Sequence, residues 1–221
     1  MHLLAIDLGK QSFHIHGITD EGEIVSKKVS RAKLEATVTD LAPQALAMEA
    51  CASAHHWGRL FETKGYHVRL IHPRFVKPFV KGAKNDAIDA EAIHEAALRP
   101  TMRFVPVKTI EQQDLQMLHR TRDRLITQRT GLINHIRGLL GEYGVVIPVG
   151  AFRFRKQVRS SVDNAPLSEL ALDNFNALIA EFQALDARIT TIDRKLAAIC
   201  RTNERCKRLS TLPGVGPVIA T

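Results

Sequence analysis

The chain has 221 residues, of which 45% are hydrophobic, 5% aromatic and 24% charged. This composition is typical of a globular protein and excludes a wholly disordered or fibrous chain, and the length allows one or two domains with cores of their own. No apolar run approaches the roughly 18 to 20 residues that cross a bilayer, so we expect a cytoplasmic protein with no membrane partner. The three cysteines form no C-x-x-C pair, which supports neither a disulfide framework nor a zinc site.

Positive charge is concentrated in the second half of the chain. The formal net charge is +8, and residues 101–221 carry most of the excess, whereas residues 1–100 are nearly neutral. A nucleic acid is the commonest macromolecular partner of such a cluster, because neutralised phosphates release condensed counterions. A solvated helix face explains the charge alone equally well. The candidate nucleic-acid-binding cations are Arg120, Arg122, Arg124, Arg129, Arg137, Arg153, Arg155, Lys156 and Arg159.

The first hundred residues alternate between strand and helix patterns. Turn residues and alternating hydrophobicity predict five strands, at residues 2–8, 12–18, 23–29, 45–50 and 66–71. Caps and apolar periodicity predict three helices, which begin after Ser30, Ser53 and Asn85. The resulting order, β-β-β-α-β-α-β-α, predicts an α/β domain of the ribonuclease-H-like (RuvC-like) class with a mixed sheet, at residues 1–106.

Long helices are predicted for residues 107–205. A first helix begins at a Thr109–Gln112 capping box, a loop follows at residues 141–166, and a second helix carries an unbroken heptad seam. The seam residues are Phe175, Leu178, Phe182, Leu185, Ile189, Ile192, Leu196 and Ile199. This coiled-coil region is interpreted either as an antiparallel hairpin within the chain or as a dimerising coiled coil, and both can hold.

The segment at residues 206–221 resembles the start of a helix-hairpin-helix unit. Its Leu-Pro-Gly-Val-Gly-Pro sequence contains Gly214 and Gly216, which would let backbone N–H groups approach a phosphate. An ordinary helix connection gives the same letters. The chain ends at Thr221, shortly into the expected second helix, so we expect a truncated C-terminal domain.

Four carboxylates stand where an α/β domain would bring them together. Asp7 ends the first strand, Glu49 ends the fourth, and Asp86 and Asp89 lie three residues apart on one face of the last helix. Each alone is explained by a turn, a cap or the helix dipole. In the ribonuclease-H-like arrangement the first and fourth strands are neighbours and the last helix crosses their ends, so all four carboxylates are expected to converge.

Converging carboxylates repel one another unless divalent cations neutralise them. An all-oxygen donor set favours Mg²⁺ or Mn²⁺ over zinc, and two such ions can activate a nucleophile and stabilise the leaving oxygen of a phosphodiester. The site therefore indicates nuclease or strand-transfer chemistry. His55 and His56 diverge by about 100° on a helix, so they are assigned to the helix surface or a substrate groove.

Four motifs give the chain a family resemblance: Ala-Ile-Asp-Leu-Gly-Lys at residues 5–10, Met-Glu-Ala-Cys at 48–51, Lys-Asn-Asp-Ala-Ile-Asp-Ala-Glu-Ala at 84–92, and the Pro-Gly-Val-Gly-Pro ending. With these motifs the chain closely resembles the DEDD transposases of insertion sequences of the IS110 family, which also includes the Piv-type DNA invertases. The resemblance covers essentially the whole chain.

The resemblance implies a RuvC-like domain whose Asp7, Glu49, Asp86 and Asp89 hold Mg²⁺ and act on DNA. It also implies a coiled coil, assembly into dimers or tetramers, and recombination guided by a structured bridge RNA. Family members continue into a C-terminal domain with a serine thought to attack DNA, and no serine of this chain matches it. We therefore expect metal and nucleic-acid binding without complete strand exchange by this chain alone.

Three other functions compete with this interpretation. An actin-like kinase or chaperone ATPase begins with a similar strand, but it needs a second Asp-x-Gly phosphate turn that the sequence lacks. A Holliday-junction resolvase or exonuclease would share the four carboxylates and the metal chemistry. A non-catalytic, oligomerising nucleic-acid-binding module would use only the heptads and the arginines.

Overall fold

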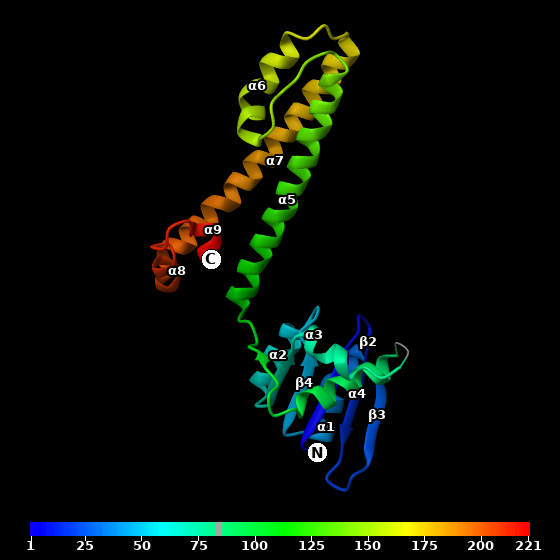
Figure 1. Cartoon of the computed structure of the whole chain (residues 1–221). Helices are drawn as coiled ribbons and strands as arrows, with labels where there is room; N and C mark the ends of the chain where they lie inside the picture. Colours follow the sequence, from blue (N-terminus) through cyan, green and yellow to red (C-terminus); the bar gives the residue numbers. More distant parts are fainter. Residues whose placement is uncertain (83–84) are drawn as a thin grey trace. The chain divides into compact units, whose positions relative to one another are not determined.

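The computed structural model describes residues 1–82 and 85–221 (Figure 1). The chain divides into two compact units, Met1–Ile110 and Glu111–Thr221.

The first unit is built on a six-stranded mixed sheet in the order β3-β2-β1-β4-β5-β6. The central pairs β1–β4 and β4–β5 are parallel, and the β1–β2, β2–β3 and β5–β6 pairs are antiparallel. The strands are β1 (Leu3–Leu8), β2 (Ser12–Ile18), β3 (Ile24–Ser30), β4 (Ala45–Glu49), β5 (His67–Ile71) and β6 (Phe104–Val105).

Helices cover both faces of this sheet. On one face, Leu4 and Ile6 of β1 pack with residues of α1 (Leu34–Leu41) and α2 (Ala54–Thr63). On the other face, Leu3 and Ala5 pack against α4 (Asp86–Ala97), which lies across the strands in Figure 1. The sheet is thus buried on both sides, which explains the near-continuous apolar run of its central strands.

The sequence-based elements of this unit agree with the structure except at their ends. Ser30 and Ser53 make no side-chain cap hydrogen bond, so both predicted caps are wrong. Ser53 instead adopts φ 69°, a left-handed conformation in which its side chain does not cap the helix. Asn85 does cap α4, since its side chain accepts a hydrogen bond from the Ala87 N–H at 3.0 Å. Three further elements have no predicted counterpart: α3 (Pro73–Val76), η2 (Lys77–Phe79) and β6.

The second unit is helical. Its elements are α5 (Ile110–Gly141), α6 (Ala151–Asp163), α7 (Glu169–Thr202), α8 (Glu204–Leu209) and α9 (Pro217–Ala220). The helices α5 and α7 are antiparallel: Arg122 pairs with Asp193, and one heptad further along α5, Arg129 pairs with Asp186, one heptad back along α7.

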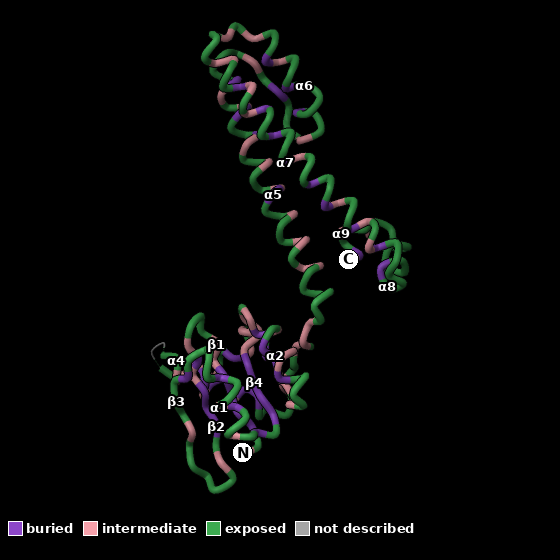
Figure 2. The backbone as a smooth tube through the Cα atoms, turned by 180° about the vertical axis from the view of Figure 1, so that it is seen from behind, coloured by how far each residue is buried: buried purple, intermediate pink, exposed green. Residues whose placement is uncertain are grey.

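The heptad seam of α7 faces the interior of its own unit. Leu185, Ile189, Ile192 and Leu196 form one core cluster with Leu125 of α5, and Figure 2 shows buried residues along both helices. At the two ends of the seam, the buried side chains are Ile179 and Cys200, each one residue beyond the predicted Leu178 and Ile199. An intrachain hairpin therefore uses most of the predicted seam.

The predicted loop at residues 141–166 is wrong in part, because it contains α6. This helix buries Phe154, Val158 and Val162 at spacings of four residues, against Phe182 of α7 among others. Its basic residues stand on the remaining faces, and Gly150 at its start, with φ 113°, gives no side-chain cap. In the described part of the chain, no helix is both long and apolar enough to cross a membrane.

Candidate active site and nucleic-acid interface

Asp7 and Glu49 lie side by side at the carboxyl ends of two neighbouring parallel strands. The register pairs Ile6 of β1 with Met48 of β4, and each carboxylate is the next residue along its strand. Because side chains alternate between the faces of a sheet, Asp7 shares the face of Leu3 and Ala5, which α4 covers. The same alternation places Glu49 on that face, and both residues are half-buried.

Asp86 and Asp89 occupy the first turn of α4, the helix that covers this face. The Asn85 cap fixes where the helix begins, and the buried Ile93 and Ala96 hold the helix against the sheet. Asp89 is half-buried and Asp86 is exposed.

The pKa shifts of Asp7 and Glu49 reflect the proximity of all four carboxylates. Burial, followed by the charges of Asp89, Asp86 and Glu49, raises the pKa of Asp7 from 3.8 to about 6, although a main-chain hydrogen bond at Leu8 acts in the opposite direction. Burial and then Asp89 also raise the pKa of Glu49, against a lowering by a nearby histidine. The structure therefore brings the four predicted residues into one interacting group.

The neighbouring Cys51 responds to the same negative charge. Burial, then Glu49, then Asp7 raise the pKa of its thiol to about 11. A thiol in this environment stays protonated at neutral pH and is a poor nucleophile.

The four carboxylates are close to one another but do not form a complete metal coordination site. Within residues 1–82 and 85–221, no group of three or more His, Cys, Asp or Glu side chains is arranged to hold a metal ion. The donor set itself fits a hard divalent cation, since it consists of carboxylate oxygens.

His55 and His56, predicted on the helix surface or in a groove, differ from each other. His55 is half-buried, and its Nδ1 accepts a hydrogen bond from the Lys108 N–H at 3.1 Å. Arg59, one turn later, donates to the Lys108 carbonyl at 2.7 Å. His55 therefore anchors the segment after β6, whereas His56 is exposed.

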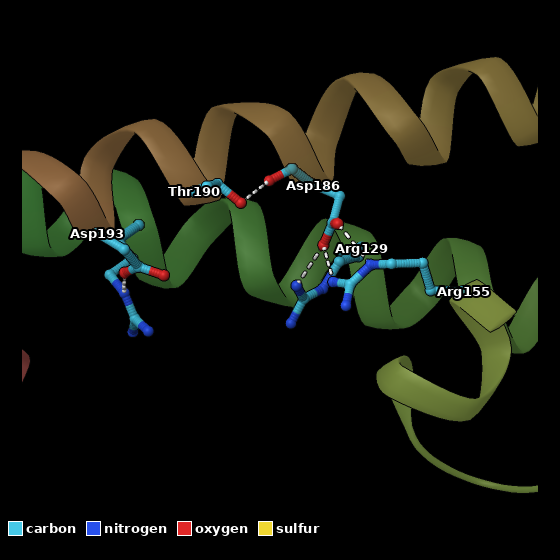
Figure 3. A network of polar contacts seen from close by, with 6 residues as sticks. Arg129, Arg155, Asp186, Thr190 and Asp193 are labelled. Atoms are coloured by element: carbon cyan, nitrogen blue, oxygen red, sulfur yellow. Dashed lines mark hydrogen bonds and ion pairs between the residues drawn. The ribbon is translucent and has the colours of Figure 1, made fainter.

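Several of the candidate nucleic-acid-binding cations are bonded within the second unit (Figure 3). Asp186 accepts hydrogen bonds from Arg129 at 2.8 Å and from Arg155 at 2.7 and 2.8 Å. These bonds, Arg155 first, hold the pKa of Asp186 below its usual range, although burial acts against them. Arg122 donates to Asp193 at 2.5 Å.

Arg137 and Arg159 are also bonded within the chain. Arg137 donates to the Ile147 carbonyl at 2.8 Å, and Arg159 bonds to Asp163 and Asn176. Asp186 and Asp193 of α7, which are far from these arginines in the sequence, thus neutralise part of the charge of the basic cluster. Within the described part of the second unit, four candidate cations are exposed and form no ion pair: Arg120, Arg124, Arg153 and Lys156.

Asp186 and Asp193 are the polar residues that sequence reasoning missed. Their spacing of seven residues matches that of Arg129 and Arg122, and this common heptad spacing was the available signal. Gly214 and Gly216 lie in the segment between α8 and α9, with φ 83° at Gly214.

Comparison with known proteins identifies the family. Residues 4–145 match a family model described as Transposase, that of the DEDD transposases of the IS110 type. The chain therefore belongs to the DEDD transposase family of IS110 insertion sequences. Lys84, the first residue of the motif at residues 84–92, lies outside the described residues.

Relatives with similar names match nearly the whole chain. It is 43% identical over 222 residues to a Pseudomonas aeruginosa protein named "Probable family 20 transposase". It is 42% identical over 224 residues to the transposase for insertion sequence element IS1111A of Coxiella burnetii, and 38% identical over 220 residues to that for IS1328 of Yersinia enterocolitica. Each match covers 99% of this chain but only 66%, 61% and 66% of the respective relative.

Proposed function

We propose that this chain takes part in the transposition of an insertion sequence by metal-dependent cleavage and strand transfer of DNA, with Asp7, Glu49, Asp86 and Asp89 as the catalytic, metal-binding residues. One observation carries the proposal: the pKa of Asp7 is raised to about 6 by burial together with the three other carboxylates. Carboxylates that repel one another cost stability, and divalent cations bound between them would offset that cost.

Each carboxylate has a role that follows from its element. Asp7 and Glu49 stand on the rigid sheet and would fix one side of the site, while Asp86 and Asp89 would reach it from the first turn of α4. Mg²⁺ or Mn²⁺, as two ions, would supply activation of the attacking oxygen and neutralisation of the leaving oxygen of a phosphodiester. Asp7, whose pKa is raised to about 6, would offer ionised oxygens to such cations above about that pH.

The partners in this proposal are nucleic acids and further copies of the chain. DNA would meet the exposed cations of the second unit, and a structured guide RNA and assembly into a dimer or tetramer are part of the proposal. A RuvC-like catalytic domain at residues 1–106, a coiled-coil region at 107–205 and a helix-hairpin-helix-like start at 206–221 complete the proposal. Gly214 and Gly216 would approach a phosphate there.

Titration of Mg²⁺ into the protein tests the central claim. Isothermal titration calorimetry should detect binding to the wild-type chain and lose it in Asp7→Asn, which keeps the shape of the side chain and removes its charge. Glu21→Gln, which removes an exposed carboxylate in the β2–β3 turn, is the matched control and should bind as the wild type does. Equal binding by Asp7→Asn would refute the metal site and favour a non-catalytic, nucleic-acid-binding oligomerisation module.

A second experiment separates the transposase from a resolvase-like or exonuclease-like nuclease, which would share the metal site. RNA that copurifies with the chain, detected by its absorbance ratio and sequenced, supports guided recombination. Mg²⁺-dependent cleavage of branched DNA by RNA-free protein supports the nuclease instead.

A further inference from the structure

Arg31, the residue after β3, lies at the same end of the strands as Asp7 but on the other face of the sheet, because its guanidinium lies over Trp57 of α2 and over Phe13. Its main-chain N–H donates to the Gln11 carbonyl at 2.9 Å, and its guanidinium Nη1 donates to the Lys10 carbonyl at 3.4 Å. Both acceptors belong to the β1–β2 turn, which begins directly after the strand that carries Asp7. The turn is tightly constrained, because a Cβ at Gly9 would lie 2.3 Å from the Ser12 carbonyl oxygen.

Two aromatic rings support the guanidinium. Arg31 Cζ lies 5.3 Å from the ring centroid of Trp57 and 5.7 Å from that of Phe13. The two rings are buried and meet edge to face, with centroids 5.3 Å apart. Arg31 itself is exposed. Cation–π contacts and the bond to Lys10 therefore hold a solvent-facing guanidinium in a defined position.

The charge of Arg31 is not neutralised by its surroundings. Among residues 1–82 and 85–110, no Asp or Glu lies within ion-pair distance of its guanidinium. This distinguishes it from Arg122 and Arg129 of the second unit, which pair with carboxylates.

An unpaired cation at this position would attract a polyanionic substrate. A phosphodiester strand that approaches four carboxylates meets repulsion, which a fixed cation at the same edge would offset. The chain between Asp7 and Lys10 spans at most about 10 Å, or about three nucleotide steps of about 3.4 Å each. A strand that crosses this end of the sheet, from the face of α4 to the face of α2, can therefore reach both the carboxylates and Arg31.

We propose that Arg31, held on the Trp57 and Phe13 rings, binds a phosphodiester of the nucleic-acid strand that enters the carboxylate site. The inference rests on the proposed function, since it names a substrate contact of the same site. A guanidinium suits this task because its planar fork donates two parallel hydrogen bonds to phosphate oxygens. Lys10, exposed in the adjacent turn, adds a second positive charge.

Trp57 provides the readout, because it is the only tryptophan in the chain. A single-stranded dodecamer of deoxythymidylate is titrated into the protein in EDTA, and Trp57 fluorescence is followed. We expect Arg31→Ala to weaken binding about 5- to 10-fold and to abolish the fluorescence change, and Arg31→Lys to restore part of the affinity. The slope of log affinity against log salt should become shallower by about 0.7 in Arg31→Ala.

Lys33→Ala is the matched control, because Lys33 is an exposed cation two residues away with no ring contact. It should keep the fluorescence response and bind within about twofold of the wild type. Thermal melting of each variant confirms that it is folded. If Arg31→Ala binds the dodecamer as the wild type does, or if Lys33→Ala loses as much affinity, the proposal is refuted.

Inorganic phosphate separates a nucleic-acid contact from a free-anion site. At equal phosphate concentration it should change Trp57 fluorescence far less than the dodecamer, and an equal response would overturn the assignment to a nucleic-acid strand. Asp7→Asn should bind the dodecamer in EDTA at least as well as the wild type. Loss of Mg²⁺ binding in Asp7→Asn, with the Trp57 response kept, therefore tests the metal site. Loss of the Trp57 response in Arg31→Ala, with Mg²⁺ binding kept, tests the Arg31 contact.

Discussion

Replacement of Asp7 by asparagine should stabilise the metal-free protein. In the folded chain, burial and three carboxylates raise the pKa of Asp7 from 3.8 to about 6. Ionised Asp7 therefore opposes folding above about pH 6, and this penalty fades as the pH falls from about 6 to about 4, where the folded protein holds the proton more tightly than the unfolded chain. Asparagine removes the charge and keeps the shape.

The size of the effect follows from the same pKa. The difference between 3.8 and about 6 corresponds to about 3 kcal/mol for a group cut off from solvent. Asp7 is only half-buried, so solvent screening reduces the expected gain to about 1 kcal/mol. For a unit of this size, that gain raises the melting temperature by roughly 4 °C.

Differential scanning fluorimetry in EDTA at pH 7.5 and pH 4 measures this gain. Asp7→Asn should melt at a higher temperature than the wild type at pH 7.5 and at about the same temperature at pH 4. Glu21→Gln, the exposed control, should melt with the wild type at both. An unchanged or lower melting temperature at pH 7.5, or an equal gain at pH 4, would refute a repulsive carboxylate group.

Three further predictions test other parts of the structure. Arg129→Met should cost about 2 to 3 kcal/mol in urea unfolding, because both side chains of the Arg129–Asp186 pair are mostly buried, whereas Arg155→Met, which removes a more exposed partner, should cost less than about 1 kcal/mol; equal costs would contradict this network. Gly58→Ala should cost about 1 to 3 kcal/mol by the same measurement, because the new Cβ would lie 2.9 Å from Val107 Cγ2, and a neutral effect would show that the segment after β6 moves freely. Iodoacetamide should label Cys51 at pH 8 far more slowly than it labels an unstructured cysteine peptide, because the pKa of the Cys51 thiol is about 11. Mass spectrometry of the labelled peptide measures the rate, and a rate equal to that of the free peptide would contradict the prediction.

Local patterns in the sequence were enough for most elements of the first unit. Residues 12–18 were predicted as the strand that the structure contains, because turn residues bound it on both sides. The helix α6 was missed because Gly150 gives no capping signal and six basic or polar residues stand among the apolar residues between Phe154 and Val162. Its buried Phe154, Val158 and Val162 did carry a spacing of four, but the neighbouring Gly and Pro residues favoured a loop.

The carboxylate site was predicted from element order, and its consequences depend on packing. The sequence placed Asp7 and Glu49 at strand ends, and only the β1–β4 register and the position of α4 put them on one face with Asp89. The pKa of Asp7 follows from that arrangement, because burial and charge proximity are properties of the folded chain.

The sequence by itself was enough to predict the periodic elements, the four acidic positions and the family, because each depends on short spacings or on motifs. Tertiary structure decided which charges neutralise one another. Arg129 and Asp186 are 57 residues apart, and their ion pair exists only because the hydrophobic seam of α7 sets the register of the hairpin with α5. The same reason applies to Arg31, whose place beside the Lys10 carbonyl depends on the pairing of three strands. Contacts between distant residues follow from packing of the whole chain, which no local pattern specifies.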